Sequence, residues 1–396
     1  MAVILIQMQN GLESEMTKRK LTNILVTGGC GFIGCNFIHY LFGESTAGGA
    51  SFTDSNFQGR IINVDCLTYA GNAESLKDID AKYGTGVEES KRRYFFEKVD
   101  ICNRQEIERI FKQYDIDTVV HFAAESHVDR SILGPEAFIK TNVMGTFTLL
   151  DTARNYWKVS LDTPREDVLF HHISTDEVYG SLGETGYFVE TTPYDPRSPY
   201  SSSKASSDHL VMAYYHTYGL PVTLSNCTNN YGPYQFPEKL LPLMISNIKD
   251  GKTLPVYGDG KNIRDWIYVE DHNRGVWQIV NQSPAGEKWN LGGENEWENI
   301  KLLNTVIDLT SKELGKNPET VRKSITYVKD RPGHDRRYAI DCTKAKKQLG
   351  WERKMTFEEG LLSTIKWYLK NNEWVEHIKT GAYKDWIQKN YKELGR

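Results

Sequence analysis

The chain has 396 residues, of which 39% are hydrophobic, so it can bury a sizeable core in one large domain or two closely joined ones. Its formal net charge is −4, and its lysines and arginines are scattered, which excludes the basic surface of a nucleic-acid-binding protein. No apolar run approaches the roughly 20 residues that span a bilayer, so we expect no membrane partner either.

The N-terminal residues and the cysteines indicate the cellular compartment of the protein. The apolar run at residues 2–6 is shorter than the core of a secretory signal and is followed by acidic residues, so we expect residues 1–20 to be a disordered extension. The six cysteines form no CxxC pair, which favours reduced, buried thiols in a cytoplasmic protein. His171 and His172 lack the spacing of metal ligands, so we expect no metal site. On an alternating strand, one of these histidines should face the core and the other the surface.

Apolar strands alternate with helical patterns in the first half of the chain. Such alternation predicts an α/β fold with a Rossmann-type, doubly wound parallel sheet. Between Gly43 and Gly59 the composition turns to small polar residues without periodicity, which predicts a surface insertion. The predicted strands span Leu21–Thr27, Arg60–Asp65, Tyr94–Val99, Thr118–Ala123 and Val168–Ser174.

In the C-terminal part the pattern changes to short elements broken by glycine and proline. This change predicts a smaller, mixed α/β substrate domain, covered by helices from about Asn299 to Leu314 and from about Phe357 to Lys370. We therefore expect a first domain at residues 21–228 and a second at residues 229–396. The segment 262–285 should return to the first domain.

The first predicted strand runs into the glycine pattern Gly28-x-x-Gly31-x-x-Gly34, after which helical spacing begins. Backbone amides at a helix N-terminus favour negative charge, so this turn can accept a pyrophosphate. A glycine cluster can also be only a tight turn, but its place between a strand and a helix favours a dinucleotide site. Asp65, at the end of the second strand, can accept hydrogen bonds from a ribose diol and repel a 2′-phosphate, which favours NAD over NADP.

Two further strand ends leave alternatives open. Asp100 and Ile101 could line an adenine pocket, or Asp100 could cap the helix that starts near Arg104. The small side chains of Ala123 and Ala124 could let a cofactor lie flat across the strand ends, or they could be packing alone.

The most informative stretch follows the fifth strand and holds two pairs of residues. Tyr200 and Lys204 are four apart and share one helical face, so the ammonium can favour the ionised phenol, which is then a base. Asp176 and Glu177 supply an acid and a second base, which simple alcohol oxidation does not need. Each pair also has a plainer interpretation, as a solvent-facing tyrosine above a lysine and as a helix cap with a solvated neighbour. Their order behind a dinucleotide turn predicts redox chemistry combined with elimination.

Six longer segments are similar to those of one known family. They are Asn63–Asn72, Ala124–Ser131, Ser174–Gly180, Asn229–Leu240, Arg264–Tyr268 and Asp330–Tyr338. Through them the chain resembles the extended short-chain dehydrogenase/reductases, and among these the dTDP-glucose 4,6-dehydratase family, from about Leu21 to Trp367.

The resemblance implies a lyase that converts dTDP-glucose to dTDP-4-keto-6-deoxyglucose with tightly held NAD. Tyr200 would remove the 4-hydroxyl proton while hydride leaves C4, and Lys204 would hold the nicotinamide ribose. Glu177 would then remove the C5 proton and Asp176 would protonate the departing 6-hydroxyl, before hydride returns to C6. Thr175 would bind the 4-hydroxyl and help to lower the pKa of Tyr200.

The resemblance also implies contact residues and an assembly. The implied NAD contacts are Phe32, Ile33, Asp65, Thr68, Asp100, Ile101, Ala123, Thr141, Tyr200, Lys204 and Asn230. The implied nucleotide-sugar contacts are Ser126, Thr175, Asn229, Lys239, Leu240, Pro255, Tyr257, Arg264, Asn299, Arg331 and His334. Helices near Glu136–Trp157 and Ser198–Tyr218 would pair across a homodimer.

Three alternatives stay open. A UDP-glucose 4,6-dehydratase would use the same chemistry, because neither the acid nor the base meets the pyrimidine. A nucleotide-sugar 4-epimerase would need the tyrosine and NAD but not Asp176 and Glu177. A non-catalytic NAD-binding scaffold would need none of these side chains.

Overall fold

The structure is a computed structural model and describes residue 19, residues 21–44, residue 46, residues 55–330 and residues 334–380. The predicted N-terminal extension, apart from Arg19, and most of the predicted insertion at residues 43–59 lie outside the described residues.

A seven-stranded parallel sheet forms the larger lobe, with strand order β10-β6-β5-β4-β1-β2-β3. This order confirms the predicted doubly wound sheet, in which the carboxyl ends of the strands meet at one edge. Thr27, for example, pairs with Val64 on one side and His121 on the other, and all three end their strands. The strands are β1 (Asn23–Thr27), β2 (Arg60–Val64), β3 (Tyr94–Glu97), β4 (Thr118–His121), β5 (Leu169–Thr175), β6 (Val222–Cys227) and β10 (Lys288–Leu291).

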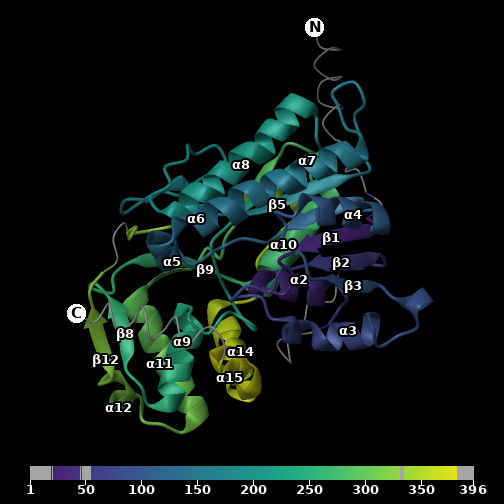
Figure 1. Cartoon of the computed structure of the whole chain (residues 1–396). Coiled ribbons are helices and arrows are strands. Elements are labelled where there is room, and N and C mark those ends of the chain that lie inside the picture. The colour runs from purple at the N-terminus through teal and green to yellow at the C-terminus, as the bar shows by residue number, and fades with distance from the viewer. Residues whose placement is uncertain (1–18, 20, 45, 47–54, 331–333, 381–396) are drawn as a thin grey trace, which may run out of the picture.

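Helices cover both faces of this sheet because its strands are apolar on both sides. Along β1, Ile24 and Val26 belong to the core under one set of helices, and Leu25 belongs to the core under the other. The first set is α2 (Phe32–Leu41), α3 (Lys77–Tyr83), α10 (Val269–Gln282) and α13 (Thr343–Leu349). The second set is α4 (Arg104–Tyr114), α7 (Thr146–Trp157) and α8 (Pro199–Tyr218), of which α7 and α8 run side by side (Figure 1).

A smaller lobe of mixed α/β structure, built around its own core, lies below the sheet (Figure 1). Its strands are β7 (Asn229–Tyr231), β9 (Ile263–Tyr268) and β11 (Glu296–Glu298) in one sheet, and β8 (Leu254–Tyr257) and β12 (Ile325–Val328) in another. Its helices are α9 (Leu240–Asp250), α11 (Asn299–Leu314), α12 (Pro318–Arg322), α14 (Phe357–Lys370) and α15 (Asn372–Thr380). The predicted bounds of the helices now labelled α11 and α14 are confirmed.

Short helical elements lie between the strands and long helices of the larger lobe. They are η1 (Ala73–Leu76), η2 (Glu89–Lys91), α5 (Val128–Leu133), α6 (Pro135–Phe138), the π-helix η3 (Ile139–Gly145) and η4 (Asp176–Tyr179). No helix of the described residues is long and apolar enough to cross a membrane. All six cysteines are unpaired, and four of them are buried.

The prediction that one histidine of the His171–His172 pair faces the surface is wrong. Both side chains are fully buried, because β5 is a central strand with helices on both of its faces. His171 hydrogen-bonds to the hydroxyls of Thr223 (2.8 Å) and Ser225 (3.1 Å) on β6. The Nε2 atom of His172 lies 3.3 Å from the Nζ of Lys204 on α8.

Candidate active site

A cleft of about 350 Å³ opens at the carboxyl ends of the central strands. It gathers residues that are far apart in the sequence, from the glycine turn near residue 28 to Lys239. Among the residues that line it are all those predicted to contact NAD: Gly28, Gly31, Phe32, Ile33, Gly34, Asp65, Thr68, Asp100, Ile101, Ala123, Ala124, Thr141, Tyr200, Lys204 and Asn230. Also among them are Ser126, Thr175, Asp176, Glu177, Asn229 and Lys239.

The glycine turn between β1 and α2 leaves no room for side chains. Gly28 has a φ of 71°, and a Cβ there would lie 2.6 Å from the backbone nitrogen of Ala123. A Cβ on Gly34 would lie 2.4 Å from the carbonyl oxygen of Gly28, so α2 packs directly on the turn. Gly31 is the N-cap of α2 and brings this helix end to the cleft. Backbone amides at such an end suit a pyrophosphate, and the turn therefore fits NAD.

Asp65 sits at the end of β2 and is held against the turn. Its Oδ2 accepts a hydrogen bond from the backbone nitrogen of Cys30 (3.0 Å), and its Oδ1 accepts one from Leu67 (2.8 Å). Burial raises the pKa of this carboxyl, and the two backbone donors act in the opposite direction. The carboxyl group is thus fixed at the strand end where a ribose diol would meet it.

Asp100, at the rim of the cleft, does not cap the following helix. Its Oδ1 accepts from the backbone nitrogen of Cys102 (2.9 Å), while the N-cap of α4 is Asn103, whose side chain accepts from Glu106 (3.4 Å). The alternative that Asp100 is only a helix cap is therefore wrong.

Tyr200 and Lys204 lie in the first turns of α8, which Ser198 and Ser201 start with a capping box. The Lys204 Nζ donates to the carbonyl oxygen of Ile173 (2.8 Å). Burial lowers the pKa of Lys204 to about 8, against the raising effect of nearby Asp208.

The prediction that the surroundings of Tyr200 lower its pKa is wrong. Burial and then the charge of Glu177 raise the pKa of Tyr200 well above its ordinary value, and the hydroxyl of Thr175 lowers it only in part. A sequence pattern indicates which charges are near a phenol, but the cost of burying its anion depends on the packing around it.

Asp176 and Glu177 open η4 directly after β5. The N-cap of η4 is Thr175, whose Oγ1 accepts from the backbone nitrogen of Glu177 (3.4 Å), so the interpretation of Asp176 as a cap is wrong. Asp176 is 2% exposed and its Oδ1 accepts from the Thr175 hydroxyl (3.3 Å). Burial, followed by the charges of Glu177 and Asp265, raises the pKa of Asp176 well above its ordinary value. A carboxyl group with a raised pKa holds its proton more readily and is suited to act as a general acid.

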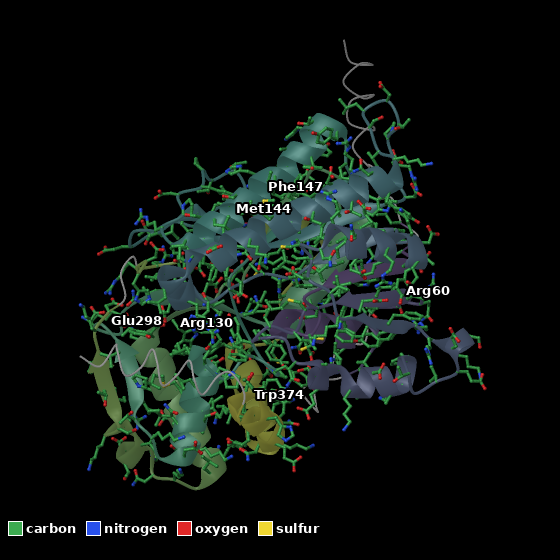
Figure 2. The ribbon with its side chains drawn as sticks, viewed as in Figure 1. Arg60, Arg130, Met144, Phe147, Glu298 and Trp374 are labelled. Atoms are coloured by element: carbon green, nitrogen blue, oxygen red, sulfur yellow. The ribbon has the colours of Figure 1, made fainter. Side chains whose placement is uncertain are left out.

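A buried carboxylate that the sequence interpretation missed lies across the cleft. Glu238 is 6% exposed and pairs with Arg130 (3.0 Å) and His127 (3.5 Å). The guanidinium of Arg130 stands 3.5 Å from the ring centre of Tyr69, where the two lobes face each other (Figure 2). Glu238 precedes the predicted Lys239 in the chain, so its place in the segment Asn229–Leu240 was the available signal.

Seven predicted sugar contacts do not line the cleft in the structure. Leu240, Pro255, Tyr257, Arg264, Asn299 and His334 belong to the smaller lobe, and Arg331 lies outside the described residues. Two of them still reach toward the cleft. The charge of Arg264 lowers the pKa of Asp176, and the hydroxyl of Tyr257 donates to Asp129 on α5 (3.5 Å).

A parallel sheet with a glycine turn for a dinucleotide, and one cleft that holds a buried tyrosine–lysine pair and a carboxyl group of raised pKa, define an NAD-dependent enzyme of the Rossmann class. Residues 25–364 match the family described as GDP-mannose 4,6 dehydratase. The chain belongs to this family, and within it to the dTDP-glucose 4,6-dehydratases.

Three relatives illustrate the match. The dTDP-glucose 4,6-dehydratase of Shigella flexneri is 51% identical over 377 residues, which is 93% of this chain and 98% of the relative. A dTDP-glucose 4,6-dehydratase of Streptomyces venezuelae, solved with NAD bound, is 41% identical with a TM-score of 0.78, over 90% of this chain and 100% of that one. A UDP-glucose 4-epimerase of Thermotoga maritima is 28% identical with a TM-score of 0.73, over 89% of this chain and 100% of that one. The fold is thus shared by dehydratases and epimerases.

Proposed function

We propose that the chain converts dTDP-glucose to dTDP-4-keto-6-deoxyglucose and water, with NAD regenerated in every cycle. The observation that carries the proposal is the buried Asp176, with its raised pKa, beside Glu177 in the same cleft as Tyr200 and Lys204. The 51% identity with the Shigella flexneri dehydratase supports it along nearly the whole chain.

The environment of each side chain determines its role in the cycle. NAD, when bound on the glycine turn, accepts hydride from the sugar C4 and returns it to C6. Tyr200 takes the proton of the 4-hydroxyl, which Thr175 orients, and the charge of Lys204 favours the phenolate that this needs. The resulting 4-keto group acidifies the proton on C5. Half-buried Glu177 removes that proton, and Asp176 gives its own proton to the departing 6-hydroxyl.

The remaining predicted residues divide between cofactor and sugar. The amides of Gly28, Gly31 and Gly34 would hold the pyrophosphate of NAD, and Asp65 would accept hydrogen bonds from its adenosine ribose. Phe32, Ile33, Thr68, Asp100, Ile101, Ala123, Ala124, Thr141 and Asn230 complete the NAD site. The nucleotide-sugar contacts are Ser126, Asn229, Lys239, Leu240, Pro255, Tyr257, Arg264, Asn299, Arg331 and His334.

The division into a NAD domain at residues 21–228 and a sugar domain at residues 229–396 follows from these roles. The return of residues 262–285 to the first domain is supported for α10, which packs on α2 and donates from Asn273 Nδ2 to the carbonyl oxygen of Ile33 (3.3 Å). It is not supported for β9, which pairs with β7 and β11 of the smaller lobe. The six unpaired thiols favour a cytoplasmic location.

A homodimer completes the proposal. Helices η3 and α5 carry four exposed apolar side chains, of which Leu133 (66%), Met144 (50%) and Ile139 (48%) are the most exposed. Met144 and Phe147 lie on the outer side of the helical layer that contains α7 and α8 (Figure 2). An apolar surface of this kind, beside two long helices, suits pairing with a second copy of the chain.

The test is incubation of the NAD-loaded protein with dTDP-glucose and, in parallel, with UDP-glucose. We expect loss of one water per dTDP-sugar with no net NADH. A sugar of unchanged mass and inverted C4 would instead establish the epimerase, and faster turnover of UDP-glucose would establish the other dehydratase. An unchanged sugar would refute the proposal.

A further inference from the structure

A group of buried charges lies directly beneath the catalytic pair. The Nε2 atom of His172 stands 3.3 Å from the Nζ of Lys204 and 3.3 Å from the Oδ1 of Asp208. Lys204 and Asp208 are four residues apart on α8, and His172 reaches them from β5. The imidazole therefore lies between the lysine of the cleft and an aspartate that does not line the cleft.

All three side chains are removed from solvent. His172 is 0% exposed, Asp208 1% and Lys204 4%. A buried charge is costly unless a partner and hydrogen bonds compensate it. The other oxygen of Asp208, Oδ2, accepts from the hydroxyls of Ser174 (2.8 Å) and Tyr194 (2.9 Å). Burial would raise the pKa of Asp208, but the neighbouring His172 and Lys204 lower it, so this residue is a carboxylate at neutral pH.

Three nearby titratable groups carry no charge near pH 7, so none of them can replace the effect of Asp208 on Lys204. The ring of His121 on β4 lies tilted against that of His172, at 5.1 Å between ring centres, and burial lowers the pKa of His121 well below the ordinary value. Burial lowers the pKa of His172 itself to about 4 and raises that of Cys227 on β6 to about 12. All three groups are therefore neutral near pH 7.

One more cation approaches the cluster from outside. The Nζ of Lys288 on β10 lies 4.4 Å from the ring centre of Tyr194, and the hydroxyl of this tyrosine donates to Asp208. Burial lowers the pKa of Lys288 and the charge of Asp208 raises it. Asp208 is thus the anion shared by the lysine in the cleft and a lysine at the edge of the sheet.

We propose that Asp208 is a positioning residue, whose negative charge, one helical turn from Lys204 and beside His172, keeps Lys204 charged and directed into the cleft from beneath Tyr200. This inference rests on the proposed function, in which a charged Lys204 assists proton removal by Tyr200. The helix fixes the aspartate four residues from the lysine, and the strand fixes the imidazole between them. Without the carboxylate, the lysine would have, among the described residues, the carbonyl oxygen of Ile173 and a neutral ring to hold a buried ammonium.

The test is the pH profile of the first half-reaction. In a Glu177→Gln background the cycle stops after oxidation of the sugar, so the rate of bound NADH formation from dTDP-glucose can be read by absorbance. That rate falls as pH rises through the pKa of Lys204, and this fall is the basic limb of the pH profile. Removal of a neighbouring negative charge lowers the pKa of an ammonium, and for Asp208→Asn we expect this basic limb to move down by about 1–3 pH units.

Two matched variants separate charge from packing. Asp208→Glu keeps the carboxylate and should leave the limb close to its native place. His171→Gln disturbs an equally buried histidine on the same strand, whose partners are Thr223 and Ser225, and should lower the melting temperature without moving the limb. If Asp208→Asn does not fold, Asp208→Ser makes the same change of charge with room for a water.

The outcomes are distinct. A limb that stays in place in the folded Asp208→Asn or Asp208→Ser protein would overturn the role of Asp208. A limb that moves equally in His171→Gln would overturn it as well, because general loosening would then explain the shift. If the Glu177→Gln protein with native Asp208 forms no NADH from dTDP-glucose at any pH, the proposed function fails instead.

Discussion

Replacement of Asp176 by asparagine separates the two halves of the proposed cycle. Asparagine has the shape of aspartate and can still accept from the Thr175 hydroxyl, which lies 3.3 Å from Oδ1, so the change removes a proton donor and little else. General acid catalysis contributes roughly 10²–10⁴-fold, which is about 3–5 kcal/mol of barrier. Because Asp176 is 2% exposed, bulk water cannot replace it as the donor, and we expect a loss toward the upper end of this range.

The assay follows two signals in one mixture. Oxidation at C4 does not need Asp176, so absorbance should show bound NADH at a near-native rate after dTDP-glucose is added. Mass spectrometry of the released sugar should show little loss of water. In the native protein NADH should stay low, since hydride returns to C6 as soon as water leaves.

Asp265→Asn is the matched control for this experiment. Asp265 is 1% exposed and its Oδ1 accepts from the backbone nitrogen of Asn295 (2.7 Å), yet it does not line the cleft. Its charge raises the pKa of Asp176. The variant should therefore keep water loss, with a basic limb moved to lower pH. Native-rate water loss by Asp176→Asn would refute the assignment of the acid, and equal losses in both variants would refute the specific role of Asp176.

Three further predictions address the cofactor, the assembly and the C-terminal helix. Gly34→Ala should abolish NAD binding in calorimetry, because its Cβ would meet the Gly28 carbonyl oxygen at 2.4 Å, whereas Gly183→Ala, with open space around it, should bind normally. Met144→Glu should give monomers in sedimentation while the cleft remains intact, and an unchanged dimer would exclude this surface as the interface. Trp374→Ala should lower the unfolding free energy by about 2 kcal/mol in denaturant titration, since the half-buried indole packs on aromatic rings of α14 and the loop before α9. No loss of stability would mean that α15 does not brace that loop.

The cofactor half of the cleft could be predicted because topology alone brings it together. Gly28, Asp65 and Ala123 follow three different strands, and the carboxyl ends of parallel strands meet at one edge of the sheet whatever the details of packing. Recognition of the strands and of the glycine turn in the sequence was therefore enough to group these residues.

The charges beneath and across the cleft could not be predicted in this way. His172 and Asp208 meet only because α8 packs on β5 with a particular rotation, and Glu238 meets Arg130 only where a loop of one lobe approaches a helix of the other. The alternation rule also failed for the pair His171 and His172, since a strand covered on both faces has no solvent side. Sequence spacing holds within an element, whereas these contacts join different elements.

The two catalytic groups of opposite role share one physical cause for their pKa shifts. Burial raises the pKa of Asp176 and that of Tyr200. The same burial therefore prepares Asp176 as an acid and opposes Tyr200 as a base. The fold can make Tyr200 a base only by adding positive charge and donors around the phenol, and Thr175 alone does not offset its burial. The charge of Lys204 must then be kept within an interior that lowers its pKa, and this makes an anchored carboxylate behind the lysine part of the chemistry.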